Sequence, residues 1–294
     1  MTLLVCALCI SIYYQQVTRD IAISHAALSF CNKSSDDRLL NLVVEKITGA
    51  RGAQRCADTL MTIHSSSHPQ QMINELANNA TEFETLSFQK GSEFINEVLY
   101  DKYSEFARQA PPSITAQLMY EPRSFEIGKM LSAAFAHGSI MHLAGNLFFF
   151  FAFAASVEII LGSLTFIAVV VTLALGTHIT YSLVLFSDPN ALPTLGLSGV
   201  VMGMIALFTF LIPTARIRCF FWFFFIVRIF VIPGWMLALW YIGWDIFNLY
   251  SGGGTPNVNL IAHVSGAAIG LSMGILFFRK QRPILRPSGR IKRV

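Results

Sequence analysis

Charged residues are scarce in this chain of 294 residues, because Lys, Arg, Asp and Glu make up 13% of it and hydrophobic residues make up 54%. This balance excludes a soluble domain of such length and is typical of a protein that crosses a membrane several times. From Leu131 to Phe278 the chain is nearly free of charge over stretches of about 20 residues, the length that a membrane-spanning α-helix needs. Residues 18–126 differ, since their charges recur every few residues, as on a water-exposed fold.

No Arg or Lys precedes the first apolar run, Leu3 to Val17. A secretory signal has a basic region at this place, so we interpret residues 1–17 as a first transmembrane helix instead. A chain start upstream of Met1 would also account for the absence of Arg and Lys before this run.

The five cysteines do not form an obvious metal-binding set. Cys6, Cys9 and Cys219 lie in apolar or membrane-proximal segments, so none of them has an obvious partner for a metal site. Cys31 and Cys56 lie in the charged segment, where they could form one disulfide or remain unpaired. Their spacing does not decide between these alternatives.

Five further transmembrane helices are predicted from the apolar runs. They are Ser139–Leu161, Leu164–Phe186, Ser198–Leu211, Pro233–Tyr250 and Leu260–Phe278. Six spans place both termini on one side of the membrane. The basic tail, residues 279–294, predicts that this side is the cytoplasm, and Arg216 and Arg218 fall on the same side. Cys219 to Ile232, which Arg228 interrupts, is expected to be an interfacial or re-entrant stretch.

The predicted fold is therefore all-α and polytopic. It consists of the first helix (1–17), a helical extracytoplasmic insert (18–126), a membrane core (127–278) and the basic tail (279–294). The insert is predicted from apolar residues at helical spacing, and it carries no catalytic motif.

Four polar residues stand out in the apolar half: Ser198 in Gly-Leu-Ser-Gly, His263 in Ala-His-Val-Ser-Gly, and His142 with Asn146 in His-Leu-Ala-Gly-Asn. Polar side chains at membrane depth are costly, so these residues are candidates for function. A serine, a histidine base and spare hydrogen-bond donors are the parts of an acyl-transfer site. His142 and Asn146 are four residues apart, hence on one helical face, and both could donate into a cavity.

Glycines on two predicted helices offer a way to bring the serine and the histidine together. Gly266, Gly270 and Gly274 follow His263 at helical spacing, and Gly199 and Gly203 follow Ser198. Small residues on facing helices allow close packing, which would bring His263 toward the Ser198 hydroxyl.

The other intramembrane polar residues receive structural interpretations. Glu158 is expected to cap or bridge helices near the tail side, His178 to make a helix-packing hydrogen bond, and His137 to tie the loop that enters the second span. Asp245, among Trp240, Trp244 and Phe247, could orient a base, but the sequence fixes no geometry for it.

These motifs resemble the rhomboid family of intramembrane serine proteases. The likeness covers about Phe125 to Phe278 and includes His-x-x-x-Asn, Gly-x-Ser-Gly and Ala-His-x-x-Gly on three spans in the family's order. It implies that Ser198 is the nucleophile and His263 the general base of a dyad, with His142, Asn146 and the Ser198 backbone N–H stabilising the oxyanion. It also implies substrates that are transmembrane segments of other membrane proteins, a lipid bilayer environment, and neither metal nor cofactor.

The chain departs from the family's pattern at two places. Gly128-Lys129 stands where Trp-Arg is frequent, and Met202 stands where several members have a tyrosine that stacks on the base. The alternatives are a catalytically inactive rhomboid-like chaperone or adaptor, a rhomboid-like processing protease for C-terminal sorting tails, and a small-solute transporter. Inactive relatives typically lack the dyad, and the chain has no internal repeat of the kind transporters show. Nucleic acid is not an expected partner, since charge beside a span usually sets topology.

Overall fold

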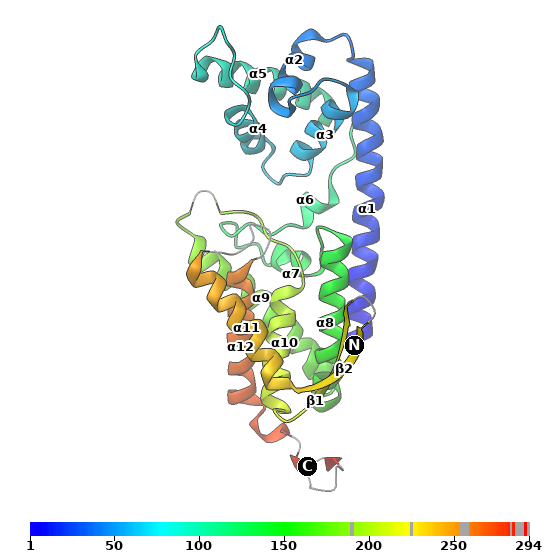
Figure 1. The fold of residues 1–294 in the computed structure, drawn as a ribbon, viewed down its shortest axis with the longest axis vertical. Coiled ribbons are helices and arrows are strands. Elements are labelled where there is room, and N and C mark those ends of the chain that lie inside the picture. The colour runs from blue at the N-terminus through cyan, green and yellow to red at the C-terminus, as the bar shows by residue number, and fades with distance from the viewer. Residues whose placement is uncertain (189–190, 224–225, 253–258, 283, 286–290, 293–294) are drawn as a thin grey trace. The chain divides into compact units, whose positions relative to one another are not determined.

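The computed structural model describes the chain except residues 189–190, 224–225, 253–258, 283, 286–290 and 293–294 (Figure 1). The chain divides into two compact units. One unit contains Met1–Ser11 and Met119–Val294, and the other contains Ile12–Leu118. Within the described residues there are twelve α-helices and four short strands, so the prediction of a mostly helical protein is confirmed.

The unit Ile12–Leu118 is helical, as predicted for this segment. Its helices are the second part of α1 (Thr2–Lys33), α2 (Arg38–Thr48), α3 (Ala53–His64), α4 (Pro69–Asn78), α5 (Phe88–Ala107) and α6 (Ile114–Leu118). Helix α1 does not end at Val17, where the predicted first span ends, because no glycine or proline interrupts the sequence before Lys33. Buried apolar side chains of α2, α3, α4 and α5 form the core of this unit.

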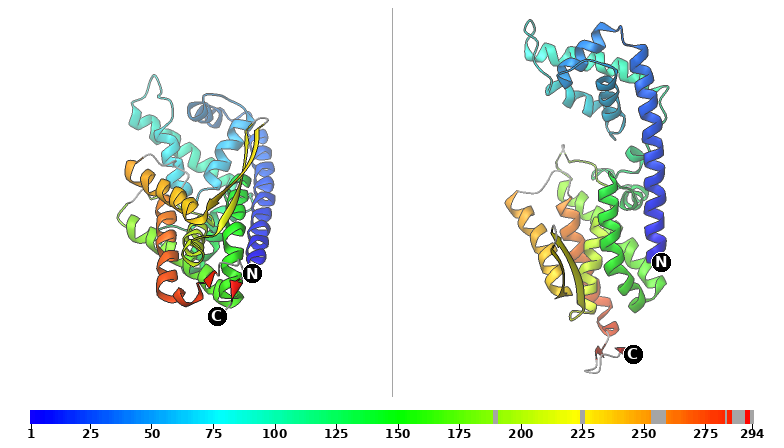
Figure 2. Two further views of the ribbon diagram at one scale, coloured as in Figure 1. Left: turned by 60° about the horizontal axis from the view of Figure 1, so that its bottom comes forward. Right: turned by 45° about the vertical axis from the view of Figure 1, so that its right-hand side comes forward.

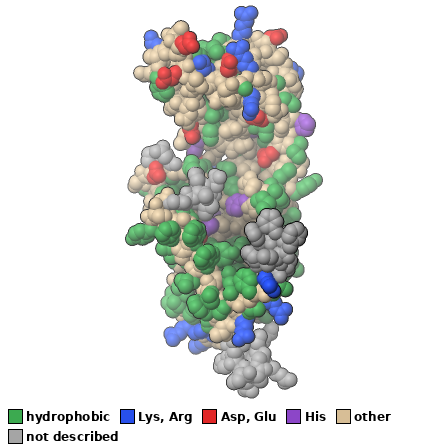
Figure 3. Space-filling model, in the orientation of Figure 1, with side chains coloured by type: hydrophobic (Ala, Val, Ile, Leu, Met, Phe, Trp, Pro, Cys, Tyr) green, Lys and Arg blue, Asp and Glu red, His purple; other side chains and the backbone are tan. Residues whose placement is uncertain are grey.

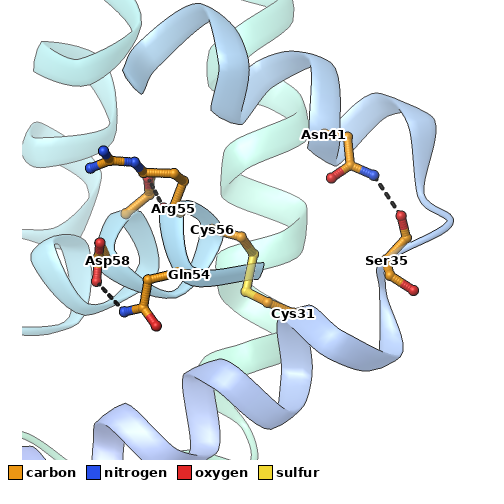
Figure 4. Close-up of a disulfide and its surroundings, with 8 residues drawn as sticks. Cys31, Ser35, Asn41, Gln54, Arg55, Cys56 and Asp58 are labelled. Atoms are coloured by element: carbon orange, nitrogen blue, oxygen red, sulfur yellow. Dashed lines mark hydrogen bonds between the residues drawn. A yellow bond between two sulfur atoms is a disulfide. The ribbon is translucent and has the colours of Figure 1, made fainter. Parts of the chain in front are cut away.

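Cys31 at the end of α1 and Cys56 in α3 form a disulfide, which settles the alternative that the sequence left open (Figure 4). Both cysteines are buried against Leu40, Leu60 and Phe106 in the same core. The bond closes a loop that contains all of α2, so it restricts the unfolded chain there.

The other unit contains the apolar helices of the chain. They are α7 (Ile127–Phe135), α8 (Ile140–Leu161), α9 (Ser163–Leu185), α10 (Ser198–Leu211), α11 (Gly234–Ser251) and α12 (Leu260–Phe277). The last five begin and end within one residue of the predicted spans. By length and composition, α8, α9 and α12 are the described helices able to cross a membrane.

Helix α10 is the central helix of this unit. It packs against α8, α9, α11 and α12, and most of its side chains are buried (Figures 1 and 2). On the face shown in Figure 3, hydrophobic side chains cover much of this unit and basic ones gather at one end of it, whereas acidic and basic side chains are scattered over the unit that contains α2–α5. An apolar outer surface around a buried helix is what a lipid environment permits.

Glycines form the contact between α10 and α12, as the sequence predicts. A Cβ atom built on Gly266 would overlap the carbonyl oxygen of Gly199, and one on Gly270 would overlap that of Gly203. One turn further along, a Cβ on Gly274 would lie 2.6 Å from the Phe210 ring. The two backbones therefore touch at Gly266 and Gly270 because side chains are absent there, and at Gly274 the Phe210 side chain packs against the α12 backbone.

A β-hairpin follows α10, where the sequence predicts an interfacial or re-entrant stretch. Strand β1 (Arg216–Phe223) pairs antiparallel with β2 (Ile226–Pro233), so this stretch is an extended hairpin and not a helix. The described part of the basic tail consists of η1 (Arg279–Gln281) and two short strands, β3 (Ile284–Leu285) and β4 (Ile291–Lys292). Arg286, Arg290 and Arg293 of the predicted tail, and Pro189 and Asn190 of the predicted loop before α10, lie outside the described residues.

Asp37 predicts a pH dependence of stability in the unit Ile12–Leu118. Its carboxylate caps α2 by accepting hydrogen bonds from the Leu39 and Leu40 N–H groups, and it pairs with Lys102 at 2.6 Å. Burial alone would raise the Asp37 pKa, but the bonds from Lys102 and the backbone outweigh it, so this pKa lies below 3.8. Such a carboxylate stabilises the fold above pH 3.8 and loses that effect as the pH falls through its folded pKa.

The test compares wild type with Asp37→Asn, whose amide oxygen still caps the helix. We expect the variant to be less stable at pH 7 by up to about 1 kcal/mol, since the pair is partly exposed. The difference should shrink as the pH falls below 3.8 when thermal unfolding is followed by circular dichroism. A difference that does not shrink with falling pH would contradict this account.

The glycine contact predicts that Gly270→Ala destabilises the membrane unit. Its Cβ meets backbone, which cannot rotate away, so we expect a loss of about 1–3 kcal/mol in the free energy of unfolding. Gly145→Ala in α8 is the matched control, because its Cβ meets nothing within 4 Å. Thermal unfolding in detergent should rank Gly270→Ala well below Gly145→Ala, and equal melting temperatures would refute the contact.

Candidate active site

Ser198 is the first residue of α10 and is half-buried. The N–H groups of a helix's first turn have no carbonyl partner within the helix, so the Ser198 N–H is available to a ligand. The loop before it is held at two points. Thr194 exchanges backbone hydrogen bonds of 2.9 Å with Tyr120, and the Gly196 N–H donates to the Ala133 carbonyl of α7.

His142 and Asn146 lie beside this loop. A Cβ on Gly196 would lie 2.8 Å from His142 Nε2 and 3.7 Å from Asn146 Nδ2. Gly196 also has a φ of +125°, which only glycine adopts without strain. Both features require glycine at position 196, two residues before Ser198. They keep the two candidate donors, His142 and Asn146, near the loop that leads to Ser198.

Asn146 is 93% buried, yet its Nδ2 atom has no hydrogen-bond partner among the described residues. An orphaned buried donor is unusual and costs free energy. Such a donor is available to an oxygen atom that arrives with a substrate.

His263 lies in the first turn of α12, whose start is fixed by Asn259. The Asn259 side chain accepts a 2.9 Å hydrogen bond from the Ala262 N–H and donates one of 2.9 Å to Thr194 Oγ1. The helix of the histidine is thereby tied to the loop of the serine. Gly199, next to Ser198, faces the carbonyl of Ala262, next to His263.

Asp245 contacts His263 directly, a geometry that could not be predicted from the sequence. Its Oδ2 atom in α11 lies 2.8 Å from His263 Nδ1. The signal was present in the sequence, since Asp245 is the one charged residue of α11 and an intramembrane charge needs a partner. Its partner lies 18 residues further along and across a loop, which periodicity cannot reveal.

The described contacts do not include a hydrogen bond between Ser198 Oγ and His263. Catalytic hydrogen bonds are often formed only when substrate binds. His263 Nδ1 is occupied by Asp245, so Nε2 is the ring atom that remains for Ser198.

The other polar residues have structural partners. Glu158 accepts hydrogen bonds from the Thr2 N–H, the Thr2 and Ser163 hydroxyls and the Met1 amino group, so it bridges the starts of α1 and α9. His178 hydrogen-bonds to the Ala174 carbonyl of its own helix, and its ring packs on Tyr120. The helix-packing hydrogen bond expected of His178 is therefore an intrahelical one. His137 is buried, bonds to the Phe135 carbonyl and stacks edge-on against His142.

No group of three His, Cys, Asp or Glu residues that could hold a metal ion occurs within the described parts of the chain. The arrangement itself offers a hydroxyl, an imidazole held by a carboxylate, and an unsatisfied amide donor.

Comparison with known proteins supports the resemblance seen in the sequence. A family model, the Rhomboid domain, matches residues 124–280, more than half of the chain and all of α7 to α12. No match was found among curated proteins. The matched region contains every candidate site residue. Since the match covers more than half of the chain, this chain is a polytopic membrane protein that belongs to the rhomboid family.

Proposed function

We propose that this protein is a serine endopeptidase that cleaves transmembrane segments of other membrane proteins. The observation that carries the proposal is the glycine contact between α10 and α12. It brings the residues beside Ser198 and His263 together, while the orphaned Asn146 Nδ2 and His142 lie beside the same loop. Family membership makes this activity the expected one.

In the proposed reaction, Ser198 Oγ attacks the carbonyl carbon of the substrate peptide bond, and its proton passes to His263 Nε2. The carbonyl oxygen becomes an oxyanion, which hydrogen bonds from His142, Asn146 and the Ser198 N–H stabilise. The C–N bond then breaks, and the imidazolium gives its proton to the leaving amine. Water attacks the acyl-enzyme and loses its proton to His263. The bond between the carbonyl carbon and Ser198 Oγ then breaks, His263 returns the proton to Oγ, and the second product leaves as a carboxylic acid.

We also propose the topology that the sequence predicts, with six spans formed by α1 and α8 to α12. The insert would be extracytoplasmic and the basic tail cytoplasmic, as in a bacterial inner membrane. The disulfide between Cys31 and Cys56 supports an oxidising location for the insert. Arg279 and Lys280 directly after α12 support a cytoplasmic C-terminus.

Labelling with a fluorophosphonate probe tests the proposed nucleophile. We expect purified wild type in detergent to label, and Ser198→Ala and His263→Ala to lose labelling, since the first lacks the reacting oxygen and the second lacks the base. Ser272→Ala, an exposed serine of α12, is the control and should label like wild type. Absence of labelling in folded wild type would favour a rhomboid-like chaperone or adaptor instead.

Asn146→Ala tests the oxyanion site. Loss of one such donor typically costs about 10²–10³ in rate, so we expect a drop of this size in cleavage of a transmembrane substrate. Met141→Ala, on the exposed side of the same helix, should cleave at the wild-type rate. A variant at Asn146 that cleaves normally would remove this residue from the site.

A further inference from the structure

Asp245 is a charged side chain on a helix that otherwise has none. Helix α11 contains a single ionisable carboxylate among eighteen mainly apolar residues. Its side chain is 15% exposed and that of His263 is 16% exposed, so both are largely withdrawn from solvent. A carboxylate in such a place is costly unless a partner compensates it.

We propose that Asp245 on α11 is a positioning residue for His263, the base of the proposed Ser198–His263 dyad. In this arrangement the carboxylate accepts a hydrogen bond from Nδ1–H, so Nε2 carries no proton and can take the one from Ser198. Asp245 itself neither gains nor loses a proton. Its negative charge stabilises the imidazolium that forms during attack. This inference rests on the proposed function.

Among the groups around His263, Asp245 is the one able to hold the ring through Nδ1. Helix α10 carries no ionisable side chain. On α9, His178 bonds to Ala174 and the Tyr181 hydroxyl donates to the Leu192 carbonyl. On α8, His142 lies against Gly196, and Glu158 is bound to Thr2. Among the described residues of these helices, Asp245 is the carboxylate within hydrogen-bond distance of the His263 ring.

The substitution Asp245→Asn separates positioning from packing, because the amide has nearly the same shape. The amide can donate to Nδ1, which places the ring proton on Nε2, where it blocks transfer from Ser198. In the Ser-His-Asp template this change costs about 10⁴ in rate. We expect the rate of fluorophosphonate labelling to fall at least about 100-fold, with an unchanged melting temperature.

Two companion variants complete the series. Asp245→Ala leaves the ring without a partner and should label no faster than Asp245→Asn, whereas Asp245→Glu should restore part of the rate. A carboxylate with only a packing role would give the opposite order, with Asn close to wild type and Ala slowest. Labelling by Asp245→Asn that is faster than wild type would mean that the contact holds the base away from Ser198. Either result overturns the proposal.

A spectroscopic measurement tests the same contact without activity. In Ser198→Ala protein with ¹⁵N-labelled histidines, above about pH 8, where an ordinary histidine is neutral, we expect the His263 proton on Nδ1. Adding Asp245→Asn should move this ring proton to Nε2. The ¹⁵N signals of His263 are identified as those that are lost in His263→Ala. If wild type fails to label but this tautomer change is seen, the proposed function fails and the positioning contact stands. If wild type labels but the tautomer does not change, the positioning role fails alone.

Discussion

The close approach of α10 to α12 determines where each candidate site residue lies. In a lipid environment, helices gain no hydrophobic free energy by associating, so contact depends on dispersion and on backbones that can come near each other. Gly199 and Gly203 on one helix face Gly266 and Gly270 on the other, and a side chain at Gly266 or Gly270 would push the helices apart. Ser198 and His263 lie at the same end of this contact. The arrangement of the candidate site is thus a consequence of missing side chains as much as of polar ones.

Hydrogen bonds at the helix starts then add precision to this packing. Asn259 caps α12 and at the same time binds Thr194 in the loop that leads to Ser198. Thr194 pairs in turn with Tyr120, and Gly196 binds Ala133. Because these contacts join three separate parts of the chain around one loop, a shift of α12 would be transmitted to the serine and to the donors beside Gly196.

The sequence predicts much of this structure because its signals are local. Apolar runs locate α8 to α12 to within a residue, and glycines at helical spacing predict the α10 contact surface. The β-hairpin escapes such reasoning, because an apolar run of eight residues fits either a strand or an interfacial helix. The disulfide and the contact between Asp245 and His263 join residues that only the tertiary fold brings together. Composition can say that Asp245 needs a partner, but it cannot say which one.

The two acidic residues on the apolar helices illustrate how a buried charge can be used in different ways. Glu158 binds backbone and hydroxyl groups at the starts of α1 and α9. None of these groups exchanges a proton during a reaction, so the charge of Glu158 stabilises the two helix starts. Asp245 instead binds an imidazole, the one kind of side chain whose ordinary titration lies near neutral pH. A carboxylate that binds helix starts stabilises the folded protein and has no further effect. A carboxylate that binds an imidazole also stabilises the positive charge whenever that ring accepts a proton, and this distinguishes the carboxylate on α11 from the one on α8.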